Sequence, residues 1–95
     1  MGVTARQVAM VRRLERAAMR VDSLPITKRQ AELWCAVHVG EDWYLHPVML
    51  MSKGCNFDYS EWTEIAPDSV YEVDDTGCYV VMAEWWSSYQ FWRRG

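Results

Sequence analysis

The sequence predicts an α+β domain in which an N-terminal amphipathic helix packs on one face of a four- or five-stranded antiparallel sheet. Two observations indicate this fold. Residues 4–22 repeat apolar side chains with helical periodicity, and after residue 31 short apolar runs alternate with turn residues. Because 95 residues suffice for one small domain, we expect residues 1–95 to form a single domain.

The N-terminal helix is predicted over residues 4–22. Thr4 and Gln7 have the spacing of a capping box, in which each side chain accepts a hydrogen bond from the other residue's backbone amide. Pro25 then prevents the helix from continuing. At about 100° per residue, the apolar face comprises Met10, Val11, Leu14, Ala18 and Val21. The opposite face comprises Arg6, Arg12, Arg13, Arg16 and Arg20.

A first antiparallel hairpin is predicted over residues 33–51. Leu33–Val39 is rich in β-branched and aromatic residues, which favour a strand, and Trp43–Met51 is its expected partner. Turn residues at positions 40–42 join the two. Because Pro47 has no amide proton to donate, we expect the second strand to be bulged or to lie at a sheet edge.

A second hairpin is predicted over residues 69–86, with two strands joined by a turn at 74–77. Residues 52–68 are expected to form a long connection that holds one short helical turn near residues 59–65. Residues 87–95 either continue the last strand or form a fifth strand or a tail. An antiparallel sheet covered on one face leaves its other face to solvent or to a partner.

Composition favours a cytoplasmic protein. The three cysteines are widely spaced and odd in number, which is typical of free thiols in a reducing compartment. We find no apolar run of the roughly 20 residues that a membrane helix needs, and no signal-peptide pattern at the start. The sequence therefore predicts no membrane contact.

Charge is strongly separated along the chain, although the net charge is only −3. Residues 1–29 hold seven basic and two acidic side chains, whereas residues 30–92 hold eleven acids and one lysine. Either the two halves neutralise each other, or one of them presents its charge to a partner. Five arginines on one helix face suit a phosphate backbone, but the acidic remainder would repel a polyanion. We therefore expect no direct binding of nucleic acid.

Metal-binding and catalytic motifs are weak. Cys35 and His38 would point to opposite faces of a strand, and no second close pair of ligands accompanies them. The sequence therefore predicts no metal and no other cofactor. One functional hypothesis is an enzyme that uses His38 or His46 beside carboxylates, but the sequence contains no recognisable nucleophile or phosphate-binding motif. We expect a protein without enzymatic activity.

Aromatic residues interleaved with acids are the most informative feature. Six Trp, five Tyr and two Phe exceed what so small a core needs. Trp34, Tyr79 and Trp85 are expected in the core, and other rings at a surface where Trp and Tyr contribute most of the binding energy. The residues predicted to contact a partner are Glu41, Asp42, Trp43, Tyr44, Asp58, Tyr59, Glu61, Trp62, Glu64, Asp74 and Asp75.

These features predict a small protein-binding module, an inhibitor that docks its acidic aromatic surface on a basic surface of a partner protein, such as one that normally holds nucleic acid. In general character the chain resembles phage-encoded inhibitors of bacterial defence systems, anti-CRISPR proteins among them, which are often small, acidic and single-domain. This resemblance carries over no residue. The alternative is a domain that stacks Trp and Tyr on a nucleotide-like small molecule. A homodimer formed through exposed aromatics also stays open.

Overall fold

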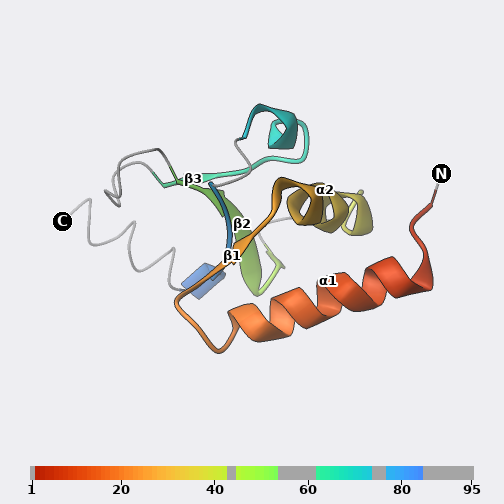
Figure 1. Ribbon diagram of the computed structural model, residues 1–95, viewed down its shortest axis with the longest axis horizontal. Helices are drawn as coiled ribbons and strands as arrows, with labels where there is room; N and C mark the ends of the chain where they lie inside the picture. The colour runs from red at the N-terminus through yellow and green to blue at the C-terminus, as the bar shows by residue number, and fades with distance from the viewer. Residues whose placement is uncertain (1, 43–44, 54–61, 74–76, 85–95) are drawn as a thin grey trace.

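The computed structural model describes residues 2–42, 45–53, 62–73 and 77–84, in which two α-helices accompany a four-stranded antiparallel sheet (Figure 1). The α+β class and four antiparallel strands are confirmed, and these residues hold no fifth strand. The elements in chain order are α1 (Ala5–Ala18), β1 (Ser23–Ile26), α2 (Lys28–Val37), β2 (Val48–Ser52), β3 (Thr63–Glu64), the 3-10 turn η3 (Val70–Glu72) and β4 (Cys78–Met82).

The predicted capping box begins α1. The Gln7 amide donates to Thr4 Oγ1 at 3.1 Å, and the Thr4 amide donates to Gln7 Oε1 at 2.8 Å. The helix ends at Ala18 and not at residue 22. The chain needs residues 19–22 to turn, because β1 must extend alongside β4 from residue 23 onward.

The buried stripe of α1 differs from the predicted one. Val11 and Ala18 are buried, as expected. Met10 is 38% exposed and Val21 is 45% exposed, so their assignment to the buried face is wrong. Glu15 is instead only 8% exposed, and a buried carboxylate needs a charged or hydrogen-bonding partner.

Residues 33–37 form the second half of helix α2, so the predicted strand over 33–39 and the hairpin over 33–51 are wrong. Thr27 and Gln30 form a second capping box, with amide-to-side-chain distances of 3.1 and 2.9 Å, and α2 follows it. The buried side chains of this segment recur with helical spacing and are Ala31, Trp34, Cys35 and His38. The helical spacing of these buried residues therefore outweighs the aromatic and β-branched content of the segment, which favoured a strand.

The sheet order is β1-β4-β2-β3, which places β2 between two neighbours. The prediction of an edge strand at Pro47 is therefore wrong. The strand begins only at Val48, so the missing proline amide removes no hydrogen bond from the sheet. The Pro47 carbonyl accepts a hydrogen bond from the Ala83 amide at 2.9 Å. The proline inside the sheet is Pro25, in the edge strand β1.

The second predicted hairpin does not form either. Its first strand is replaced by η3, and β4 pairs with β1 and β2. Thr63 and Glu64 belong to β3, which pairs with β2, where a helical turn was expected. Trp85 and the predicted C-terminal strand or tail at 87–95 lie outside the described residues.

Two clusters of buried side chains form the core. The larger one joins Val11 of α1 and Trp34 of α2 to sheet residues such as Leu50 and Val80. The second contains Met49, Met51, Trp62 and Val81. Val80 belongs to the larger cluster and its neighbour Val81 to the second. Because neighbouring residues of a strand point to opposite faces, the two clusters lie on opposite faces of the sheet. In the part of the chain described, no helix has the length and apolar character required to cross a membrane.

Candidate functional site

The segment between α2 and β2, of which we call residues 39–42 and 45 the docking loop, exposes apolar and acidic side chains together. Val39 is 75% exposed and Leu45 is 81% exposed. Glu41 and Asp42, both predicted to contact a partner, are also exposed. Trp43 and Tyr44 lie outside the described residues.

A buried histidine lies where this loop leaves α2. His38 is 0% exposed and is the C-terminal cap of the helix. Its Nε2 is 2.5 Å from Oε1 of Glu15, the buried carboxylate of α1. The Glu15 carboxylate also lies 3.8 Å from the guanidinium of Arg12. This buried contact connects the middle of α1 to the end of α2.

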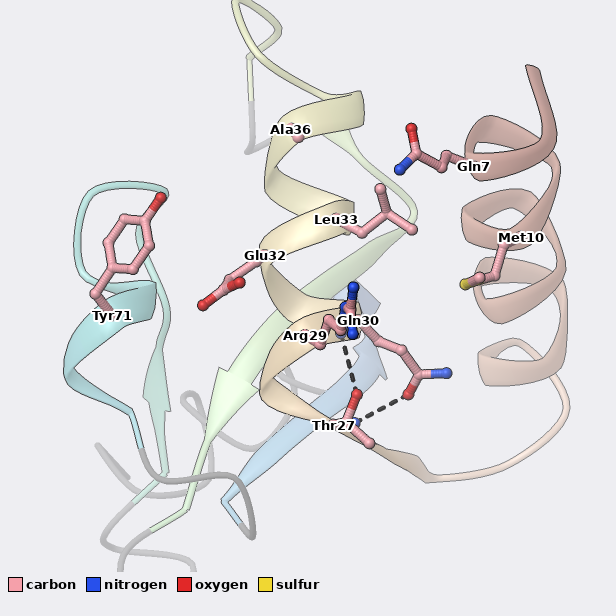
Figure 2. Close-up of a pocket in the computed structure, with 9 residues that line it drawn as sticks. All are labelled: Gln7, Met10, Thr27, Arg29, Gln30, Glu32, Leu33, Ala36 and Tyr71. Carbon is pink, nitrogen blue, oxygen red and sulfur yellow. Dashed lines mark hydrogen bonds between the residues drawn. The ribbon is translucent and has the colours of Figure 1, made fainter. Parts of the chain in front are cut away.

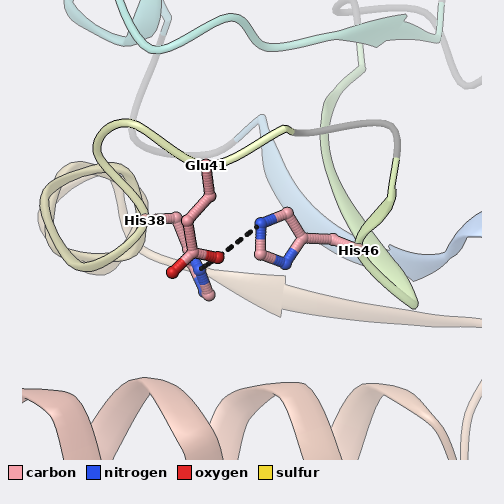
Figure 3. Close-up of side chains that lie close together, drawn as sticks. All are labelled: His38, Glu41 and His46. Carbon is pink, nitrogen blue, oxygen red and sulfur yellow. Dashed lines mark hydrogen bonds and ion pairs between the residues drawn. The ribbon is translucent and has the colours of Figure 1, made fainter.

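Glu41 returns from the loop to the same histidine. Figure 3 shows its carboxylate beside the rings of His38 and His46. Glu41 Oε2 is 3.2 Å from His38 Nδ1 and 3.1 Å from His46 Nε2. The hydrogen bond with His38 lowers the pKa of Glu41, with smaller contributions from the charges of His38, His46 and Arg12. The carboxylate is therefore held in its ionised form.

Ring contacts close the base of the loop. The His38 and His46 rings meet edge to face with centroids 4.2 Å apart. The Trp34 ring lies 4.6 Å from the His38 ring and 5.6 Å from the His46 ring. The residues at the two ends of the docking loop are thus packed together. We call Glu15, Trp34, His38, Glu41 and His46 the polar cluster.

A glycine makes the return of Glu41 sterically accessible. Gly40 has φ = +85°, a backbone conformation that L-residues with a side chain rarely adopt. The Glu41 amide can then donate to the His38 carbonyl at 3.1 Å, and the Leu45 amide donates to the Asp42 carbonyl, also at 3.1 Å. The first of these hydrogen bonds closes a tight turn around Gly40.

The sequence reasoning missed this cluster. It placed Cys35 and His38 on opposite faces of a strand, whereas both are buried residues of one helical segment. The neighbours of His38 are Glu41 and His46, and one ligand atom from each of the three residues lies within 4.8 Å of the others. The signal was Glu15, a carboxylate amid the apolar stripe of α1, which had to find a partner.

Other predicted contact residues lie elsewhere. Trp62 is 4% exposed, and its ring is 5.1 Å from that of Tyr79, so it is not the exposed anchor that we expected. Glu64 is half-buried in β3, and burial raises its pKa. Trp34 is buried in the core, as predicted, and Tyr79 packs against the second cluster. The predicted contact residues outside the described part are Trp43, Tyr44, Asp58, Tyr59, Glu61, Asp74 and Asp75.

A depression of about 670 Å³ over α2 is the feature most relevant to the small-molecule alternative. Its lining includes the exposed ring of Tyr71 together with Met10 and Gln7. Figure 2 shows Tyr71 on one side of α2 and Met10 and Gln7 on the other. These side chains therefore do not enclose a common space in which a nucleobase could stack on Tyr71 and also contact the opposite wall.

The four arginines of α1 and Arg20, which follows the helix, are all exposed. Within the described residues, Arg12 is the arginine of this face that forms an ion pair, and its partner Glu15 belongs to the same helix. The charge of Arg12 also contributes to lowering the pKa of Glu41. Comparisons of the chain with protein-family models, with curated proteins and with solved structures each give no match. The function is accordingly inferred from the residues of this chain.

Proposed function

We propose that this protein is a non-enzymatic protein-binding module whose docking loop contacts a basic surface of a partner protein in the cytoplasm. The observation that carries the proposal is the exposure of Val39 and Leu45 beside the carboxylates of Glu41 and Asp42. Large aliphatic side chains that are 75% and 81% exposed gain free energy when a partner removes them from water.

The apolar and acidic side chains of the loop indicate which kind of surface the partner offers. Apolar side chains surrounded by charged ones are the usual arrangement of a protein interface, with an apolar centre and a polar rim. Two neighbouring carboxylates attract lysine and arginine side chains and speed the encounter at low salt. The partner is therefore expected to offer a shallow apolar patch with basic residues around it. A protein groove that normally binds nucleic acid carries such a positive charge.

The polar cluster supports binding by fixing the loop beforehand. An interface loop that is already ordered loses less conformational entropy on association, so more of the contact energy appears as affinity. The contacts of Glu41 with His38 and His46 hold the loop from beneath. Inhibition by occlusion needs no reacting group, only this shape and charge.

Capture of partners from a lysate of the cells in which the protein occurs tests the proposal. Three versions of the tag-immobilised chain are compared: the unaltered chain, the docking-loop variant Val39→Ser/Leu45→Ser, and the control variant Met19→Ser/Val21→Ser. The control pair is also exposed, at 50% and 45%, but belongs to the connection between α1 and β1. We expect a protein with a basic surface to bind the unaltered and control chains and to be lost from the loop variant.

Purified partner then gives the affinities. The loop variant should bind at least about 10-fold more weakly, because truncation of an interface anchor typically costs more than 1 kcal/mol. The melting temperature should stay unchanged in both variants, since the substituted side chains are exposed. Equal binding by the loop variant and the unaltered chain would overturn the proposal. So would self-association of this chain through the loop, which would make the partner a second copy.

A further inference from the structure

The polar cluster brings two imidazoles and a carboxylate to one point. The atoms that converge are His38 Nδ1, Glu41 Oε2 and His46 Nε2, with Oε2 at 3.2 and 3.1 Å from the two nitrogens. Ligand atoms bound to one Zn²⁺ ion at about 2.0–2.1 Å in tetrahedral geometry lie roughly 3.3 Å apart. The two observed separations are close to the edges of such a tetrahedron.

Glu15 adds a second observation, on the far side of the His38 ring. His38 Nε2 lies 2.5 Å from Glu15 Oε1, and Glu15 is only 8% exposed. Histidines that bind metals almost always donate their other ring N–H to a carboxylate, a carbonyl or a water, which fixes the tautomer and the ring orientation. Glu15 is positioned to hold His38 in this way.

The charges of Glu15 and Glu41 also favour the binding of a cation. The hydrogen bond between His38 and Glu41 needs a proton on Nδ1, but when only Nε2 carries a proton and donates it to Glu15, the Nδ1 lone pair points toward the Glu41 carboxylate. Two lone pairs 3.2 Å apart repel each other unless a positive charge lies between them. With neutral imidazoles, Glu15 and Glu41 carry two negative charges and Arg12, 3.8 Å from Glu15, carries one positive charge. The net negative charge that is left favours a cation.

We propose that His38, Glu41 and His46 bind one Zn²⁺ ion and that Glu15 orients His38 for this purpose. Two nitrogens and one oxygen suit zinc, which also uses two histidines and one glutamate in known catalytic sites. The Glu41 side chain is 52% exposed, so an ion can enter from solvent and a water can complete the coordination. Bound zinc would tie both ends of the docking loop to the end of α2. The zinc proposal does not require that the docking loop bind a partner, although Glu41 belongs to both proposals.

Calorimetric titration of metal-free, tag-free protein with Zn²⁺ tests the site. We expect one ion per chain with a dissociation constant in the micromolar range or below, and a rise in melting temperature of several degrees at saturation. Co²⁺ as a spectroscopic probe should give the visible absorption of a four-coordinate ion. Zn²⁺ should also shift the ring resonances of both His38 and His46 in NMR spectra.

Three single variants test the site, and two further variants serve as controls. Glu41→Gln and His46→Ala should weaken zinc binding by at least about 100-fold, and Glu15→Gln by about 10–100-fold, the usual effect of losing a residue that orients a ligand. Asp42→Asn removes the neighbouring carboxylate, and Cys55→Ser removes a thiol that could bind zinc elsewhere. Both control variants should bind zinc like the unaltered chain.

Several results would overturn the proposal. They are the absence of zinc binding, binding that persists undiminished in both Glu41→Gln and His46→Ala, and binding that disappears in Cys55→Ser. A His38 ring that carries protons on both nitrogens and does not respond to Zn²⁺ would also overturn it, because a proton would then supply the positive charge. Melting curves of each variant without metal confirm that the fold is retained before affinities are compared.

Discussion

Two charged surfaces of this protein differ in how their side chains are held. The outer face of α1 carries exposed arginines, whose long side chains extend into solvent from a regular helix. The docking loop carries Glu41, whose carboxylate contacts the rings of His38 and His46, and these side chains are 0% and 11% exposed. Charge on the first surface is solvated, whereas charge on the second is anchored to the core.

This difference separates two kinds of electrostatic contribution. A solvated arginine contributes net charge and long-range attraction, but an exposed ion pair is worth only about 0–1 kcal/mol. An anchored carboxylate also fixes the backbone on either side of it. In this protein the anchored carboxylate lies in the sequence between Val39 and Leu45, two large apolar side chains that are 75% and 81% exposed. The polar cluster is thus expected to determine the shape of the docking loop.

Removal of the central anchor should have the largest effect. His38→Ala leaves the buried carboxylate of Glu15 without its histidine partner, which typically costs about 3–5 kcal/mol. For a domain of this size the melting temperature should fall by more than about 12 °C, measured by circular dichroism. Arg16→Gln on the solvated face is the matched control and should melt like the unaltered chain. A loss below about 1 kcal/mol in His38→Ala would remove the contrast between the two surfaces.

The turn that returns Glu41 to the cluster can be strained without touching any side chain. Gly40 has φ = +85°, and a Cβ there would meet nothing within 4 Å, so Gly40→Ala adds backbone strain alone. The expected loss is about 1–2 kcal/mol of unfolding free energy, measured by urea denaturation. Gly2→Ala, which also places a Cβ in open space but lacks a positive φ, should be neutral. Equal stability of the two variants would show that the turn is not fixed.

Acidification sharpens the comparison, because it titrates the anchored carboxylate and leaves arginine charged. The pKa of Glu41 is lowered from its usual 4.5, chiefly by the hydrogen bond to His38. A lowered folded-state pKa gives stability that is present above pH 4.5 and is lost as pH falls through the folded value. In metal-free protein, Glu41→Gln should flatten the decline of melting temperature between about pH 5 and pH 3. Parallel declines in both proteins would contradict the assigned contact.

The smallest effect is expected on the solvated face. Replacement of Arg13, Arg16 and Arg20 by glutamine, one at a time, should change the unfolding free energy by no more than about 0.5 kcal/mol each. Partner capture through the docking loop should persist in these variants. A loss of more than 1 kcal/mol in any of them would mean that this face is also anchored.

The start of α1 was predicted correctly because it depends on residues that are close in the sequence. The start of α1 depends on Thr4 and Gln7 alone, and both hydrogen bonds of the capping box are present. The same signal at Thr27 and Gln30 begins α2, but the aromatic and β-branched residues that follow were interpreted as a strand. Helical spacing of the buried residues outweighs β propensity here.

The sheet and the polar cluster depend on contacts between distant residues. β1 pairs with β4 although the partners are far apart in the sequence: Ser23 pairs with Val81, 58 positions later. No turn signal specifies this pairing. Glu15 meets His38 through the packing of α1 against α2. The exposed positions of Glu41 and Asp42 follow from local polarity, whereas the contacts beneath them follow from the fold.

Hydrogen exchange of the docking loop, followed residue by residue in NMR spectra, tests most directly whether the polar cluster fixes the loop. The amide of Glu41 donates to the His38 carbonyl, and that of Leu45 donates to the Asp42 carbonyl. We expect both amides to exchange at least about 100-fold more slowly than in an unstructured chain, and this protection to fall in His46→Ala. Exchange at the unstructured rate in the unaltered protein, or equal protection in the variant, would contradict the account.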